Sequence, residues 1–135
     1  MAGGKKITGV IFSDLGQAAS FMSLDWVQNL LQEKVGFKPY PATLNLRLES
    51  ATEIRQWKLI REENPGLDFP PADAGFCSAR LFLVEIAGRI PGAVLLPEVK
   101  DYPANKIELV APVHLKEILG LQDGGSLTLE FLAMS

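Results

Sequence analysis

The chain lacks the residues on which several classes of protein depend. It has one cysteine in 135 residues, Cys77, which excludes an internal disulfide and is typical of a reducing compartment. No apolar run approaches the roughly 20 residues that a membrane-spanning helix needs, so we expect no membrane partner. The first residues lead into a strand-like run without a long apolar signal segment, which predicts a cytoplasmic protein.

Basic residues are too few and too dispersed for a nucleic-acid-binding surface. The chain carries 13 Lys and Arg against 16 Asp and Glu, which gives a net charge of −3, and it has no basic cluster. Recognition of nucleic acid by charge requires the opposite balance. We therefore expect no nucleic-acid partner.

Common catalytic signatures are absent as well. The sequence has no zinc-ligand spacing, no Walker loop and no dinucleotide fingerprint. The one histidine, His114, has no partner at metal or catalytic-triad spacing, which predicts a structural role. Nothing near Cys77 in the sequence would activate its thiol, so we expect a small core residue on the buried side of a strand with Leu81 and Leu83.

The composition that remains predicts one globular domain spanning 1–135. Hydrophobic residues make up 47% of the chain and charged residues 21%, which suits a folded domain with a core of its own. Several short strands with few helices predict a mainly β protein, built as a closed or partly closed β-barrel. The expected strands cover 6–12, 43–48, 76–87, 89–96, 106–110 and 126–131.

Helices and turns are expected between these strands. Ser23 is the predicted cap of a first helix that Gly36 ends, and a capping box at Ser50 predicts a second. Pro112 opens a third, short helix that ends at Gly120. The helices are expected over 24–35, 51–62 and 112–119, with connections over 13–20, 64–75, 87–88, 97–105 and 122–125.

The stretch 36–48 is the one around which the chain is organised. Pro39 and Pro41 prevent the preceding helix from continuing, and from residue 43 polar and apolar residues alternate strictly. This alternation predicts a half-buried strand. The leucines expected in the core are Leu44, Leu46 and Leu48. The residues expected on the opposite face are Thr43, Asn45 and Arg47.

Thr43 and Asn45 place a hydroxyl and a carboxamide two residues apart, beside the rigid proline turn. Two neutral oxygens held in this way can contribute to a Mg²⁺ site whose other ligands are water and phosphate. They are equally the residues of an ordinary solvated strand face, and spacing alone favours that interpretation. Glu108 alternates with apolar neighbours and points away from the core, as a ligand contact, a base or a solvated residue.

The connection over 13–20 joins a strand to a helix, a junction that can bind phosphate through backbone amides. It holds a single glycine, Gly16, whereas phosphate loops usually need several. From these residues alone, a plain connector is the better interpretation.

Six segments occur in order along nearly the whole chain. They read F-M-S-L at 21–24, G-F-K-P-Y-P-A-T-L-N-L-R-L at 36–48, G-A-V-L-L-P at 92–97, I-E-L-V-A-P at 107–112, L-K at 115–116 and L-Q-D-G at 121–124. In this combination the chain resembles the archaeal-type CTP-dependent riboflavin kinases, whose turn and strand read G-F-x-P-Y-x-G-T-L-N-L-K-L. The T-L-N strand after the proline turn is the most specific part of the resemblance.

The resemblance implies a six-stranded β-barrel of the cradle-loop type with short helices. It also implies transfer of a phosphoryl group from CTP to riboflavin, giving FMN and CDP, with Mg²⁺ bound by Thr43 and Asn45. Lys100 and Glu108 match positions that contact the flavin. The positions that match nucleotide contacts are Leu15, Gly16, Gln17, Ala18, Ala19, Ser20, Val113, His114, Leu115 and Lys116.

Both ligand-binding loops depart from the family pattern. Where the family reads G-L-G-E-G-x-Y, this chain has Gln17, Ala18 and Ser20 in place of glutamate, glycine and an aromatic residue. Lys100 stands where a threonine is common, and Ala42 replaces a glycine. In the family, the position of Ala18 is a glycine. If that glycine has positive φ or touches phosphate, the Cβ of Ala18 is expected to strain the loop or block the ligand. A flavin- or nucleotide-binding protein without turnover is therefore the alternative to a kinase, and the acidic balance disfavours a DNA-binding barrel.

Overall fold

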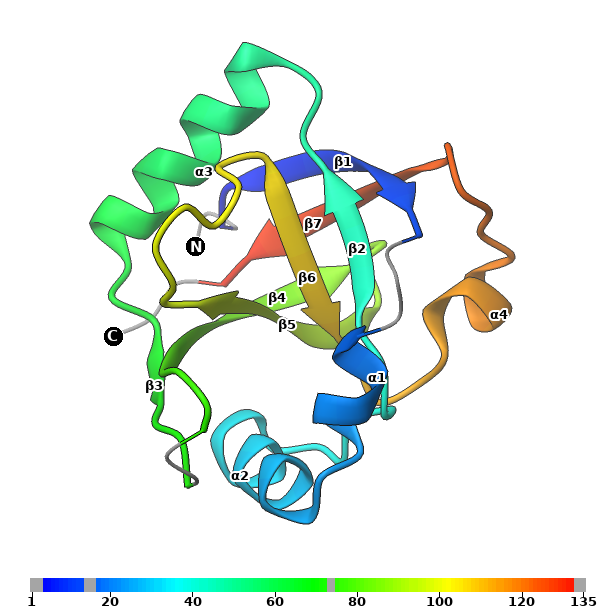
Figure 1. The fold of residues 1–135 in the computed structure, drawn as a ribbon. Coiled ribbons are helices and arrows are strands. Elements are labelled where there is room, and N and C mark those ends of the chain that lie inside the picture. Colours follow the sequence, from blue (N-terminus) through cyan, green and yellow to red (C-terminus); the bar gives the residue numbers. More distant parts are fainter. Residues whose placement is uncertain (1–3, 14–16, 73–74, 133–135) are drawn as a thin grey trace.

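The computed structural model describes residues 4–13, 17–72 and 75–132, and it shows a mainly β protein (Figure 1). None of the described helices is long and apolar enough to cross a membrane. The elements in chain order are β1 (Lys6–Phe12), α1 (Gln17–Met22), α2 (Asp25–Val35), β2 (Leu44–Arg47), α3 (Ala51–Glu63), β3 (Leu67–Phe69), β4 (Ala79–Ile86), β5 (Ile90–Pro97), β6 (Lys106–Val110), α4 (Leu115–Leu119) and β7 (Ser126–Phe131).

Six strands close into an antiparallel barrel in the order β4-β5-β6-β2-β1-β7, and β7 pairs back onto β4. One edge of β4 pairs with β5 along its whole length. The other edge is divided, because residues 84–86 pair with β7 whereas residues 79–81 pair with β3. The predicted six-stranded barrel is confirmed.

β3 was not expected, since the sequence over 64–75 reads as a Pro/Gly-rich connection. The strand forms because the short segment reaches the free part of the β4 edge, where Leu67 pairs with Leu81 and Phe69 with Ala79. Phe69 is buried there. A partner supplied from outside the segment thus overrides its turn-rich composition.

Alternate residues of the strands fill the barrel interior. Leu44, Leu46 and Leu48 are 8%, 0% and 1% exposed and belong to this core, as predicted. From α3, the ring of Trp57 packs edge-on against Phe82, with 5.2 Å between the ring centroids. The interior is therefore a packed core rather than a ligand cavity.

A second apolar core lies outside the barrel, between α1 and α2 and the outer face of β4, β5 and β6 (Figure 1). Because both faces of β4 and β5 are covered, these strands carry apolar residues on both sides, which explains their imperfect alternation. Leu81 is fully buried in this second core and Leu83 is partly buried against it. The buried members are Met22, Val27, Leu31, Phe69, Ala79, Leu81, Ala93, Leu95 and Val110.

Capping residues and glycines in the sequence correctly predicted where several helices and strands begin or end. The Ser50 hydroxyl accepts a hydrogen bond from the Glu53 amide at 3.1 Å, the contact of a capping box. Gly36 and Gly120 end α2 and α4 with φ of 84° and 64°, in the left-handed region. The tight turn between β4 and β5 falls at 87–88, as expected.

Two helix starts differ from the sequence prediction. α2 begins after Leu24, and the Ser23 hydroxyl donates instead to the Ala19 carbonyl at 2.8 Å, at the end of α1. Ser23 therefore does not cap α2, because α1 occupies the residues that were expected to be a loop. α4 begins only at Leu115, later than the helix predicted from Pro112.

Replacing Leu46 by alanine tests the burial of the β2 leucines. Because its side chain is fully buried, Leu46→Ala should lower the free energy of unfolding by about 2–5 kcal/mol, measured by urea denaturation. Leu59→Ala on α3, where the side chain is 39% exposed, is the control. A loss below about 0.5 kcal/mol for Leu46→Ala would contradict this packing.

Candidate functional site

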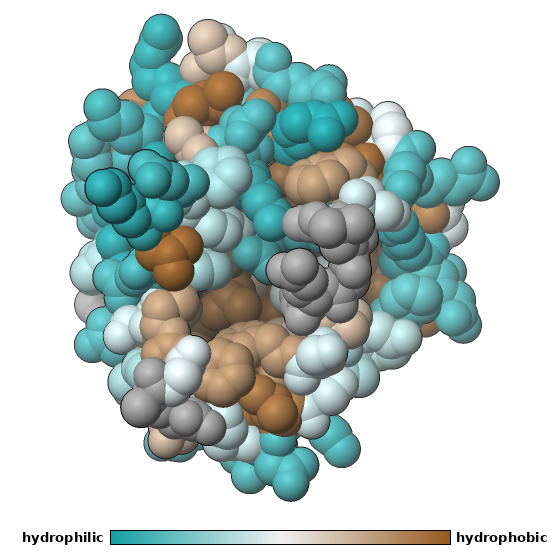
Figure 2. Space-filling view, viewed as in Figure 1, coloured by the Kyte–Doolittle hydropathy of each residue, from teal (hydrophilic) through white to brown (hydrophobic). Residues whose placement is uncertain are grey.

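A pocket of about 480 Å³ opens on the outer side of the barrel, over β2 and β6. Figure 2 shows this side of the molecule hollowed, with apolar side chains gathered along the hollow. Small-molecule sites usually measure about 300–1,000 Å³, so the volume suits one ligand of that kind. The lining residues are Phe12, Ser13, Ala19, Phe21, Tyr40, Ala42, Thr43, Leu44, Asn45, Phe76, Cys77, Ala79, Leu95, Pro97, Lys106, Glu108, Leu109, Ala111, Val113, His114, Leu115 and Lys116.

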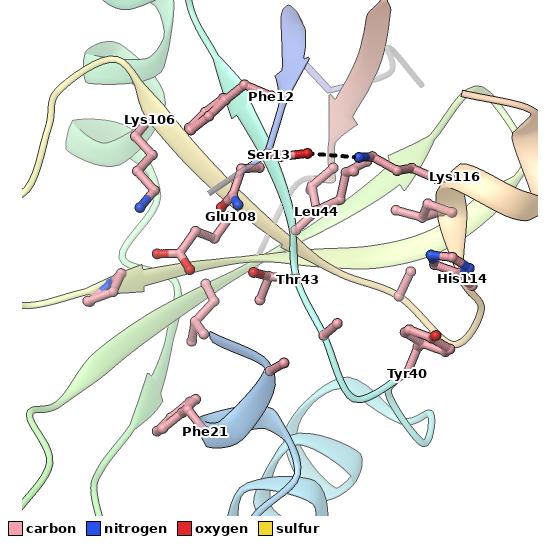
Figure 3. A pocket seen from close by; sticks show the side chains of 18 of the residues that line it. Phe12, Ser13, Phe21, Tyr40, Thr43, Leu44, Lys106, Glu108, His114 and Lys116 are labelled. Atoms are coloured by element: carbon pink, nitrogen blue, oxygen red, sulfur yellow. Dashed lines mark hydrogen bonds between the residues drawn. The ribbon is translucent and has the colours of Figure 1, made fainter. Parts of the chain in front are cut away.

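Thr43 and Asn45 line this pocket from the start of β2, and Figure 3 shows the Thr43 side chain directed into it. Thr43 Oγ1 and Asn45 Oδ1 are buried, and neither has a hydrogen-bond partner in the part of the chain that the structure describes. A buried polar atom left unpaired costs about 1–3 kcal/mol. Thr43 and Asn45 thus each leave a polar atom unsatisfied at the pocket.

The backbone before β2 is fixed from the neighbouring strand. The Tyr40 amide donates to the Ala111 carbonyl, just beyond β6, at 2.7 Å, and the Ala42 amide donates to the Tyr40 carbonyl at 2.8 Å. Two consecutive contacts of this kind hold the turn that delivers Thr43. The backbone that leads into Thr43 is thus fixed by the fold.

Glu108 lies opposite Asn45 in the pairing of β2 with β6. It is a buried charged residue, 9% exposed, and its Oε2 accepts a hydrogen bond from the Tyr102 hydroxyl at 2.5 Å. This bond fixes the carboxylate at the pocket wall (Figure 3). Alternation in the sequence correctly predicted that Glu108 points away from the barrel interior. No sequence pattern predicted its hydrogen bond with Tyr102.

A polar network at the rim joins three distant parts of the chain. Lys116 Nζ donates to Asp123 Oδ1 at 2.7 Å and to Ser13 Oγ at 3.2 Å, and Ser13 Oγ donates to Asp123 Oδ2 at 2.6 Å. The hydrogen bond from Lys116, followed by that from Ser13, lowers the pKa of the Asp123 carboxyl below its ordinary value. The network ties the end of β1 to α4, and sequence reasoning missed both Ser13 and Asp123.

His114 has a partner that sequence spacing did not predict. Its ring stacks on Tyr40, with 4.9 Å between ring centroids and 11° between planes, and its Nδ1 lies 3.4 Å from Glu117 Oε2. Val113 and Leu115 line the pocket on either side of it. All four residues of segment 113–116 line the pocket, and their contact with a nucleotide stays a prediction.

Aromatic rings form the opposite wall. Phe21 of α1 and Phe76 line the pocket and lie 5.5 Å apart between ring centroids, and Trp26 packs against both. Cys77, next to Phe76, is exposed and lines the pocket, so its prediction as a core residue is wrong. It precedes the first residue of β4, Ala79, and the strand alternation does not extend to it.

The residues implied for the ligand-binding loops are only partly gathered at the pocket. Leu15 and Gly16 lie outside the described residues, and 17–22 form α1 instead of a loop. Ala19 lines the pocket and Ser20 is exposed, whereas Lys100 is exposed in the connection between β5 and β6 and does not line it. In the described part of the chain, no group of three or more His, Cys, Asp or Glu side chains could hold a metal ion.

The chain is thus a closed antiparallel β-barrel with a pocket on its outer face, which has unpaired oxygens on its floor and aromatic rings in one wall. The family model CTP-dep_RFKase, described as "Domain of unknown function DUF120", matches residues 11–131. The chain belongs to this family.

Curated relatives carry the name riboflavin kinase. The chain is 34% identical over 128 residues to the one from Pyrobaculum islandicum, covering 93% of this chain and 59% of the relative. It is 35% identical over 128 residues to the one from Archaeoglobus fulgidus, covering 94% and 54% respectively. For Saccharolobus solfataricus the identity is 30% over 128 residues, with 93% and 73% covered. The chain thus spans a little over half the length of the first two relatives.

Stability should depend on pH through Asp123. Because its pKa is lowered in the folded state, its carboxylate stabilises the fold above the ordinary value of 3.8, and this contribution is lost as the pH falls through the lowered pKa. Asp123→Asn should therefore unfold at lower urea concentration than the wild type at neutral pH, with the difference shrinking in acid. Asp68→Asn, at an exposed carboxylate on β3, is the control. A difference that stays constant with pH would refute the assignment.

Proposed function

We propose that this protein is a riboflavin kinase that transfers a phosphoryl group from CTP to riboflavin, giving FMN and CDP, with Mg²⁺ as its metal ion. The observation that carries the proposal is the pair of buried, unpaired oxygens of Thr43 and Asn45 on the floor of the pocket. Membership of the family and the names of its relatives support the reaction. We place the reaction in the cytoplasm, where nucleoside triphosphates are available.

The two oxygens fit Mg²⁺, which prefers oxygen ligands and usually keeps water and phosphate in its remaining positions. When bound, the ion neutralises charge on the phosphates of the donor. The contribution of the chain is positioning, because β2 and the hydrogen-bonded turn before it hold Thr43 Oγ1 and Asn45 Oδ1 in place.

The two walls suit the two substrates. On the nucleotide side, segment 113–116 supplies His114, which stacks on Tyr40, and the Lys116 ammonium at the rim. On the flavin side, Phe21 and Phe76 offer ring faces, and Glu108 offers a carboxylate that Tyr102 holds in place. Lys100 does not line the pocket, so its assignment to the flavin stays a prediction.

A binding protein without turnover is the second candidate, because α1 occupies part of the nucleotide loop. Ala18 lies within α1, where alanine is the most favourable residue, so the expected backbone strain does not arise there. The substitution instead favours helix in a segment where a glycine would leave the backbone freer. Between the two candidates, we propose a protein that binds both substrates and transfers the phosphoryl group from CTP to riboflavin slowly.

Removing either oxygen tests the metal site. Thr43→Ala and Asn45→Ala should each weaken CTP binding by about ten- to a hundredfold in the presence of Mg²⁺, because a hydrogen bond or contact to a charged group is worth about 1.5–3 kcal/mol. Without the metal, CTP binding should stay nearly unchanged. Isothermal titration calorimetry measures both conditions. Thr52→Ala, at an exposed position on α3, is the control. Equal weakening with and without Mg²⁺ would indicate misfolding or direct nucleotide contact instead.

The rate of FMN formation tests the reaction and the altered loop together. Purified protein with riboflavin, CTP and Mg²⁺ should form FMN slowly, followed by chromatography, with ATP as the comparison donor. Gln17→Glu, Ala18→Gly and Ser20→Tyr combined should raise the rate, up to about a hundredfold if misplacement by about 1 Å is relieved. No FMN from either protein, with both substrates bound, would favour the binding protein. A wild-type rate equal to that of the archaeal relatives would refute the loop argument.

A further inference from the structure

A second groove, of about 320 Å³, lies between α3 and the connection from β5 to β6 (Figure 1). The function proposed above makes no use of it. Two arginines from separate elements line it, Arg61 on α3 and Arg80 on β4, and both side chains are half-buried. Its other lining residues are Trp57, Leu96, Pro97, Glu98, Val99, Asp101, Tyr102, Pro103 and Ala104.

Arg80 is fixed by the end of α3. Its Nε donates to the Pro65 carbonyl at 2.9 Å, and its Nη2 donates to the Asn64 carbonyl at 3.0 Å. The guanidinium also lies 4.9 Å from the ring centroid of Phe82. These contacts explain the residue as a cap for the carbonyls at the end of the helix, a favourable place for a cation. Its Nη1 has no hydrogen bond among the described residues.

Arg61 has no comparable structural explanation. Its guanidinium lies 5.2 Å from the ring centroid of Trp57, and only its Nε donates within the described chain, to the Trp57 carbonyl at 3.4 Å. Burial, and then the nearby charge of Arg80, lower the pKa of Arg61. Neither arginine forms an ion pair within 4.0 Å with a carboxylate of the described residues. Arg80 Nη2 also donates to the Arg61 carbonyl at 3.5 Å, so the two residues share one groove.

We propose that this groove binds a phosphate-sized oxyanion between the guanidinium groups of Arg61 and Arg80. The unused N–H groups of both side chains match such an anion, because guanidinium presents planar donors to phosphate oxygens. Glu98 and Asp101 also line the groove and oppose any anion there, so the ligand must be small enough to contact the two guanidinium groups directly. The ligand class is thus a compact one, either free phosphate or a single phosphate monoester.

The groove is separate from the main pocket but adjoins it. Tyr102 lines the groove, and its hydroxyl donates to Glu108 in the main pocket. An experiment on this site therefore needs two variants, one that removes a cation from the groove and one that removes a cation from the main pocket. Arg61→Gln disables the groove, and Lys116→Gln removes the cation at the rim of the main pocket.

Inorganic phosphate is the probe, titrated by calorimetry at constant ionic strength so that screening stays fixed. The wild type, Lys116→Gln and Arg55→Gln, an exposed arginine on the same helix, should bind it alike. Arg61→Gln should bind at least about tenfold more weakly, since a charged hydrogen bond is lost. Arg61→Lys should fall between, because it keeps the charge without the planar fork. Glycerol 3-phosphate then distinguishes an esterified phosphate from the free ion.

Unchanged binding by Arg61→Gln would overturn the proposal, as would the absence of saturable binding by the wild type. Loss of binding in Lys116→Gln alone would place the phosphate in the main pocket and overturn it too. Thermal unfolding without phosphate shows whether Arg61→Gln folds, and Arg61→Lys carries the test if it does not. Because no flavin or CTP enters these titrations, their outcome is independent of kinase activity.

Discussion

The two-sided character of β2 is the constraint on which the rest of the structure depends. The strand lies between β1 and β6, and its register pairs Leu46 with both Ile11 and Ile107 while Asn45 lies opposite Glu108. Because neighbouring side chains of a strand point to opposite sides, a slip of one residue would place the leucines in the pocket and the polar oxygens in the core. Burial of the leucines therefore also fixes the position of the site.

The pocket exists because the helices cover only part of the barrel's outer surface. α1 and α2 bury the outer face of β4 and β5 in the second core, while the polar floor at β2 and β6 lies open to the pocket. Charged groups around this floor are already paired, as in the bond between Tyr102 and Glu108 and that between Lys116 and Asp123. The oxygens of Thr43 and Asn45 on this floor have no such partner among the described residues.

Much of the fold followed from local patterns. The alternation over 43–48, the capping box at Ser50 and the glycines that end α2 and α4 each act through residues only a few positions apart. Thr43 and Asn45 were candidates for the same reason, since alternation puts them on one face. The pattern failed for Cys77, which lies just outside β4, and for Ser23, which directly follows the unexpected helix α1 and donates its hydroxyl to a carbonyl of that helix.

The sequence by itself determined which face of β2 is apolar, where the main helices and turns end, and the family to which the chain belongs, because these rest on spacing and residue type along the chain. Tertiary structure alone decided that β3 completes the edge of β4, that Tyr102 holds Glu108, and that Arg61 and Arg80 line one groove. Each of these contacts joins parts of the chain whose meeting depends on how the barrel closes and where its connections run. No local pattern carries that information.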